Sequence, residues 1–211
     1  MVEWLQNNAN IISAVSSVAM LVVWIIYLQA FLGGYRQQVR AKIVITRAVG
    51  KTLGAHCFIS NMSYQAIYLE AVIVTLEYDD YRASVRVTDF NLADADRPSD
   101  PRMETHQGPL HSGNQTWIGT FDKLIDRVAE NQGVRPGDFT ASGRSITLEV
   151  MVVADYLSED LVVGAKRRFL AEWTGDTWLV SPETIQTEQI RSRSDRRRLA
   201  RLLAEEGEQA A

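Results

Sequence analysis

The longest uncharged run in the chain separates Glu3 from Arg36, and it constrains the fold more than any other feature. Within this run, residues 11–32 read IISAVSSVAMLVVWIIYLQAFL and are apolar on every face of a helix. As an α-helix they would be about 33 Å long, enough for the roughly 30 Å hydrocarbon core of a bilayer. The sequence therefore predicts a transmembrane helix over residues 11–33 and a short extracytoplasmic stub over residues 1–10.

Two other classes of apolar segment fit this run less well. A signal peptide has a basic leader and a small-residue cleavage site, whereas residues 1–10 carry only Glu3 and the far end reads FLGGYRQQ. A core helix of a soluble protein is seldom apolar on every face for six turns. We expect a single-pass membrane protein.

Basic residues flank the apolar run on its carboxyl side only. These topology-determining residues are Arg36, Arg40, Lys42, Arg47 and Lys51, with no acid before Glu70. Because Lys and Arg beside a span favour the cytoplasmic side, we expect the N-terminus outside and the C-terminal domain in the cytoplasm. No organelle transit peptide is recognisable, so the predicted membrane is the bacterial inner membrane.

Small residues recur every fourth position in the outer half of the predicted span, at Ala9, Ser13 and Ser17. Such a stripe permits close packing of two membrane helices and is a candidate homo-oligomer contact. The alternative is that each serine hydroxyl bonds to the carbonyl four residues before it.

The pattern after Tyr35 changes to alternation of apolar and polar residues, which is typical of strands. Strands are predicted over residues 41–49, 55–60, 66–76, 81–88, 114–118, 145–154, 162–171 and 177–180. Short turns join most of them, so the fold class is mainly β. We expect an antiparallel β-sandwich of immunoglobulin-like architecture over residues 36–180, with an open barrel as the alternative.

Two helices and one long loop interrupt this pattern. The apolar stripe Phe121, Leu124, Ile125 and Val128 predicts a short helix capped by Thr120. Ser181-Pro182 is a helix-start signal, so a basic helix is expected from residue 183 to about 206, within a charged tail over residues 181–211. Residues 90–113 lack periodicity and predict a long loop.

Charge is distributed unevenly along the chain. Residues 52–190 hold 21 acidic and 11 basic residues, a net charge of −10. The tail then carries six arginines within 11 positions: Arg191, Arg193, Arg196, Arg197, Arg198 and Arg201. This cluster could bind anionic lipid, dock on the acidic domain or a partner, or form a solvated charged helix without a partner. Nucleic acid is the least favoured partner, because no aromatic platform or known binding motif accompanies the arginines.

Catalytic and cofactor motifs are absent from the sequence. His106 and His111 lie near several aspartates in the predicted loop, but no metal-binding spacing is present. Cys57 follows His56 on a predicted strand, where neighbouring side chains point to opposite faces, so we expect an inert core thiol. We predict no cofactor, no metal and no catalytic residue.

These observations favour a membrane-anchored interaction or accessory-subunit module. The partner would bind through the membrane helix or the sandwich. The alternative is a membrane-anchored enzyme or ligand sensor that uses the 90–113 loop.

Overall fold

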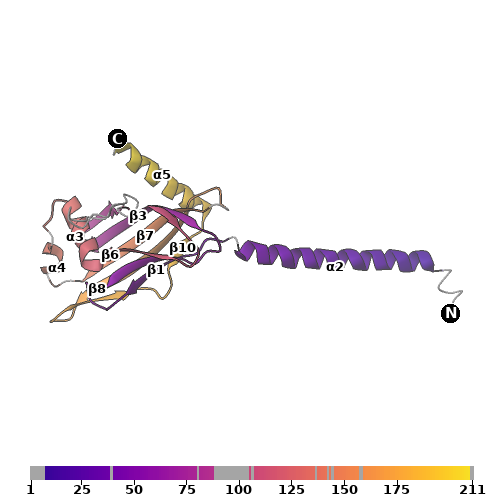
Figure 1. Cartoon of the computed structure of the whole chain (residues 1–211), viewed down its shortest axis with the longest axis horizontal. Helices are drawn as coiled ribbons and strands as arrows, with labels where there is room; N and C mark the ends of the chain where they lie inside the picture. Colours follow the sequence, from indigo (N-terminus) through magenta and orange to yellow (C-terminus); the bar gives the residue numbers. More distant parts are fainter. Residues whose placement is uncertain are drawn as a thin grey trace. The chain divides into compact units, whose positions relative to one another are not determined.

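The computed structural model of the chain (Figure 1) describes residues 8–38, 40–79, 81–87, 105, 107–135, 137–141, 143, 145–156 and 159–209. The chain divides into two compact units, Met1–Arg40 and Ala41–Ala211. The first unit holds one helix, and the second holds the β domain with its C-terminal helix.

The N-terminal unit is formed by α2 (Ala9–Gln38), whose apolar side chains are exposed. Its segment Asn10–Tyr35 is long and apolar enough to cross a membrane. The helix continues beyond the predicted end at residue 33, because Gly33 and Gly34 stay in the helix and neither takes a positive φ. Ser17 Oγ donates a hydrogen bond to the Ser13 carbonyl at 2.9 Å. This bond to the carbonyl four residues earlier is one of the two alternatives that the sequence suggests for the serine stripe.

A three-stranded antiparallel sheet in the order β1-β2-β6 forms one layer of the β domain. Its strands are β1 (Ile43–Ala48), β2 (His56–Asn61) and β6 (Gln115–Thr120). All three were predicted within a few residues. Ile45, Cys57 and Ile59 point to the core and are fully buried, as the alternation in these strands requires.

The larger sheet has seven strands, with β10-β8-β7-β3-β4 as its main order. These are β3 (Ile67–Tyr78), β4 (Tyr81–Arg86), β5 (Gly108–Leu110), β7 (Ile146–Tyr156), β8 (Val163–Trp173), β9 (Trp178–Pro182) and β10 (Glu188–Ile190). All its pairings are antiparallel, so the prediction of a mainly β, antiparallel fold is confirmed. The strand order does not establish the immunoglobulin-like arrangement, which stays a prediction.

One hydrophobic core lies between the two sheets. Ile43, Ile45 and Ile59 of the smaller sheet share it with Val74 and Val152 of the larger one. Helix α3 (Phe121–Asn131) covers one side of this core. The side chains of its predicted apolar stripe are buried there: Phe121, Leu124, Ile125 and Val128. Phe139 of the short α4 (Asp138–Ala141) packs on the same core.

The predictions for two segments, residues 183–192 and residues 90–113, are wrong in part. Residues 183–192 are not helical: β10 occupies Glu188–Ile190, and the C-terminal helix α5 begins at Arg193 and ends at Gln209. The predicted 90–113 loop also contains a strand, β5, which pairs with β3. In that loop, residues 90–104 and His106 lie outside the described residues.

The segment after β9 completes the domain by covering the outer edge of β1. The Gln189 side chain exchanges two hydrogen bonds with the Ile43 backbone, and the Thr187 hydroxyl accepts from the Ile45 N–H. Arg167 of β8 donates to the Ile45 carbonyl at 2.6 Å and to two carbonyls of the β9–β10 loop. An edge strand whose backbone groups are satisfied in this way is protected from pairing with another chain.

Cys57 is fully buried beside these contacts. Burial raises the pKa of its thiol to about 12, although the nearby Arg167 guanidinium acts in the opposite direction. Because the thiolate is the reactive form, this cysteine is inert in the folded chain, as predicted.

Candidate binding groove

The outer face of the larger sheet, which points away from the core, carries an ordered set of polar and apolar side chains. Strand register places Ile73, Met151, Lys166 and Glu188 in one row across β3, β7, β8 and β10. The next row places Ser84, Thr75, Glu149 and Arg168 side by side. Alternation along each strand puts these residues on a single face.

Helix α5 covers one end of this face through a small apolar cluster. Leu199 is buried and packs with Ala71 and Val153, and with the partly buried Met151 and Leu203. The contact depends on a glycine of β8: a Cβ built on Gly164 would lie 2.7 Å from Leu199 Cδ1 and 3.1 Å from Ile190 Cδ1. The missing side chain of Gly164 therefore lets the helix approach the sheet.

Arg196 fixes the first turn of α5 to the β7–β8 turn. Arg196 is only 8% exposed, and its guanidinium donates hydrogen bonds to the carbonyls of Leu161 and Val162 and to the Glu159 carboxylate. The distance from Nε to the Val162 carbonyl is 2.7 Å, and that from Nη1 to Glu159 Oε2 is 3.1 Å. A buried arginine with this many acceptors is a structural anchor for the helix.

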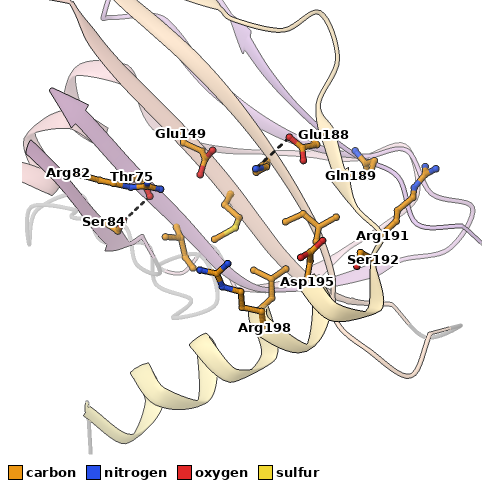
Figure 2. A pocket seen from close by; sticks show the side chains of 15 residues that line it. Thr75, Arg82, Ser84, Glu149, Glu188, Gln189, Arg191, Ser192, Asp195 and Arg198 are labelled. Carbon is orange, nitrogen blue, oxygen red and sulfur yellow. Dashed lines mark hydrogen bonds and ion pairs between the residues drawn. The ribbon is translucent and has the colours of Figure 1, made fainter. Parts of the chain in front are cut away.

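A groove of about 670 Å³ lies between α5 and the outer face of the sheet (Figure 2). Its sheet side is formed by β3, β4, β7, β8 and β10, and its helix side by Asp195, Arg198 and Leu199. Ile73, Met151 and Ile190 supply apolar lining, and Thr75 and Ser84 supply hydroxyls that bond to each other at 2.8 Å. A concave site with an apolar lining and a few polar groups is a typical ligand-binding surface.

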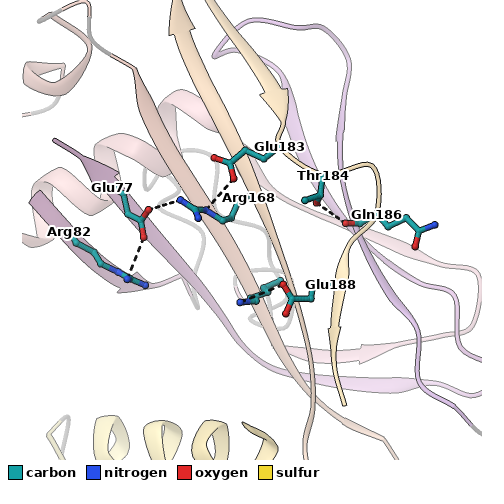
Figure 3. Close-up of polar contacts among 8 residues, drawn as sticks. Glu77, Arg82, Arg168, Glu183, Thr184, Gln186 and Glu188 are labelled. Atoms are coloured by element: carbon teal, nitrogen blue, oxygen red, sulfur yellow. Dashed lines mark hydrogen bonds and ion pairs between the residues drawn. The ribbon is translucent and has the colours of Figure 1, made fainter. Parts of the chain in front are cut away.

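Some charges near the groove are already paired with one another. Glu77 accepts a hydrogen bond from Arg168, with 2.7 Å between Arg168 Nη2 and Glu77 Oε2, and its Oε1 lies 3.4 Å from Arg82 Nη1 (Figure 3). Arg168 also pairs with Glu183, with 3.4 Å between Nε and Oε2. Lys166 lies 3.6 Å from Glu188 on the neighbouring strand. These pairs are only partly buried and contribute little to stability.

Other charged groups that line the groove have no ion pair among the described residues. They are Glu149 on β7, Arg191 before α5, and Asp195 and Arg198 on α5. Glu149 is half-buried, and the other three residues are exposed. The groove thus offers charges of both signs beside an apolar surface.

The predicted arginine cluster has two different surroundings in the structure. Arg196 is buried in the contact described above, so the expectation that it contacts lipid or a partner is wrong. Leu199 of the same helix is also buried, because it packs on Ala71 and Val153 of the sheet. The remaining members are exposed: Arg191, Arg193, Arg197, Arg198 and Arg201. Docking of the tail on the domain, one of the alternatives from the sequence, is therefore the arrangement observed.

The residues of the predicted basic flank also differ in their surroundings. Arg40, Lys42 and Lys51 are exposed, whereas Arg47 donates a hydrogen bond to the Val180 carbonyl within the β domain. The side chains of Arg36 and of Ala9 in the small-residue stripe are not among those that the structure describes. Nothing in the structure tests the stripe as a helix contact.

Sequence reasoning missed Gly164, Glu149 and Arg198 as members of one site. Glu149 and Ser84 lie at polar positions of two alternating strands, which indicates an outward face, but alternation does not show that α5 lies over them. Among the described residues, no group of three or more His, Cys, Asp or Glu could hold a metal ion. Comparison with family models, characterised proteins and solved structures found no match.

Proposed function

We propose that this chain is a single-pass inner-membrane protein whose cytoplasmic β domain binds an extended peptide segment of a partner protein in the groove beside α5. The observation that carries the proposal is the groove itself, which combines apolar lining with charges of both signs that have no ion pair among the described residues. The immunoglobulin-like sandwich belongs to the same proposal, supported by two antiparallel sheets that share one core.

The dimensions of the groove favour a peptide over a compact small molecule. Its sheet side crosses five strands, which are about 4.8 Å apart, so it is roughly 19 Å wide. An extended peptide advances about 3.3 Å per residue, so about six residues would cross it. A groove that crosses the sheet between a helix and exposed polar rows suits such a segment.

The charges define the chemistry of the peptide. An acidic residue would pair with Arg198 or Arg191, and a basic residue would pair with Glu149 or Asp195. Apolar residues between them would contact Ile73 and Met151. We therefore expect a segment that carries both charges and at least one apolar anchor.

Selection from a random hexapeptide library on the purified full-length chain tests this proposal. The selected peptides should carry an acid and a base, and Arg198→Glu should weaken their binding by about 10- to 100-fold, because a charge-assisted contact contributes about 1.5–3 kcal/mol. Fluorescence polarisation of one labelled peptide measures the change.

Arg197→Glu is the matched control for that experiment. Arg197 is also exposed, adjoins Arg198 on α5 and does not line the groove, so the charge change is the same. Equal losses for the two variants would mean that only the general basic charge of α5 attracts the peptide. That result, or the absence of any selected peptide, would contradict the groove as the binding site.

The proposed topology has its own test. Cys57 is too buried to report on either side of the membrane, so we would introduce Asp176→Cys in the exposed β8–β9 turn. In intact bacterial cells this thiol should resist a membrane-impermeant reagent and react once the inner membrane is permeabilised. Reaction in cells whose inner membrane is intact would reverse the orientation.

A further inference from the structure

One end of the β domain combines exposed apolar side chains with basic residues. We define this entry surface by Lys42, Met62, Tyr64, Arg191 and Arg193, at the end where the chain enters the domain. Hydrogen bonds tie its parts together: Met62 N–H donates to the Lys42 carbonyl, and Lys42 N–H donates to Ser63 Oγ, both at 2.8 Å. The Gln189–Ile43 bonds bring the β10–α5 junction to the same end.

The apolar members of the entry surface are unusually exposed for their type. Tyr64 is 72% exposed and Met62 is 54% exposed, although both occupy a turn anchored by the buried Asn61 and Ser63. Asn61 fixes this turn by donating to the Gln65 and Leu110 carbonyls. The structure therefore presents these two side chains to the surroundings on a well-bonded turn.

Charge at this end is basic on the side of the β2–β3 turn. Lys42, Arg191 and Arg193 are exposed, and no ion pair engages them among the described residues. Acidic groups lie on the neighbouring β7–β8 hairpin, where Asp155 and Asp160 are exposed and Glu159 is held by Arg196. In the half formed by β1, the β2–β3 turn and the β10–α5 junction, the exposed bases Lys42, Arg191 and Arg193 outnumber the exposed Asp195 in the first turn of α5.

We propose that the entry surface binds the surface of an anionic lipid bilayer. In the sequence, only residues 39–41 separate the end of α2 at Gln38 from Lys42, and an extended chain of this length spans at most about 14 Å. A membrane that holds α2 is therefore within reach of this end. Basic residues with an aromatic and an apolar side chain suit the headgroup region, and each Lys or Arg near anionic lipid contributes about 1 kcal/mol.

This proposal rests on the membrane anchor in the proposed function but not on the groove. Its consequence is a preferred orientation of the domain, with the β2–β3 turn against the lipid. The β8–β9 turn would then point away, since the 11 residues of β8 separate the two ends by about 33 Å.

Fluorescence quenching in lipid nanodiscs tests the orientation with the full-length chain. A polarity-sensitive thiol dye on Met62→Cys should lose emission when nitroxide lipid is included in nanodiscs of mixed phosphatidylcholine and phosphatidylglycerol. The same dye on Asp176→Cys, at the opposite end, should keep its emission. The buried Cys57 does not compete for the dye.

A charge variant then tests the lipid chemistry. Lys42→Glu with Arg193→Glu, at two exposed residues that do not line the groove, should reduce quenching of the Met62→Cys label, and nanodiscs of phosphatidylcholine alone should do the same. Equal quenching at both label positions, or none at Met62→Cys, would overturn the proposal. Failure of the chain to enter nanodiscs would instead refute the anchor, and a protein partner at this end would leave the label insensitive to lipid composition.

Discussion

Replacing Arg196 with alanine should lower the free energy of unfolding by about 2–3 kcal/mol, because it removes an ion pair and leaves the Leu161 and Val162 carbonyls without their donor. The loss combines these two effects, since Arg196 is almost entirely buried while its partner Glu159 is partly exposed. Denaturant unfolding of the full-length chain in detergent, followed by tryptophan fluorescence, measures it.

Arg197→Ala is the control for this substitution. The two arginines are neighbours on α5 and have the same helix propensity, but Arg197 is exposed. Its replacement should change the free energy of unfolding by no more than about 0.5 kcal/mol. Similar losses for both variants would show that arginine at these positions acts through general charge, and that the contact of Arg196 with the β7–β8 turn does not hold the helix.

Replacing Gly164 with valine should release α5 from the sheet. The added side chain would occupy space held by Leu199 and Ile190, and relief by a small shift is limited because Leu199 is buried among Ala71 and Val153. Valine is otherwise favourable on a strand, so the sheet itself should persist. We expect amide exchange in residues 195–203 to accelerate by about 10- to 100-fold, equivalent to losing the roughly 1.5–3 kcal/mol from burial of Leu199.

The double variant with Leu199→Ala distinguishes this mechanism from general damage to β8. Leu199→Ala alone should also accelerate exchange in α5. Because Gly164→Val already displaces Leu199, the second substitution should add little, and the two effects should be strongly non-additive. Additive effects would indicate that Gly164→Val disturbs the strand rather than the contact with α5.

The sequence predicted most of the core strands because hydrophobic alternation reports which side chains face the core. Strands β4 and β7 alternate strictly, and β3 is apolar in both phases because α5 and its neighbours cover part of its outer face. Helix α3 was equally clear from its single apolar stripe. These elements show the same period in sequence and structure.

The C-terminal segment was misread because its alternation is not hydrophobic. Thr187 and Gln189 face β1, whereas Glu188 and Ile190 face the groove, so the period of two is carried mainly by polar residues. Ser181-Pro182 resembles a helix start, but these residues pair with β8. Hydrogen bonds from side chains to an edge strand leave no hydropathy signal.

The groove could not be predicted because its members come from distant parts of the chain. Gly164 has no neighbouring turn signal, since its role is to leave space for Leu199, 35 positions later. Arg196 is one of six arginines, and nothing in the sequence distinguishes the buried one. Long-range packing decides both roles.

Amide hydrogen exchange of residues 195–203 in the unaltered full-length chain tests the docking of α5 most directly. A helix fixed by Arg196 and Leu199 should exchange at least on the order of 100-fold more slowly than the unfolded chain, as a packed element does. An isolated helix of this length is only marginally stable in water, so it gives little protection of its own. Exchange at nearly the rate of an unfolded peptide would show that α5 is not docked and that the groove has no second wall.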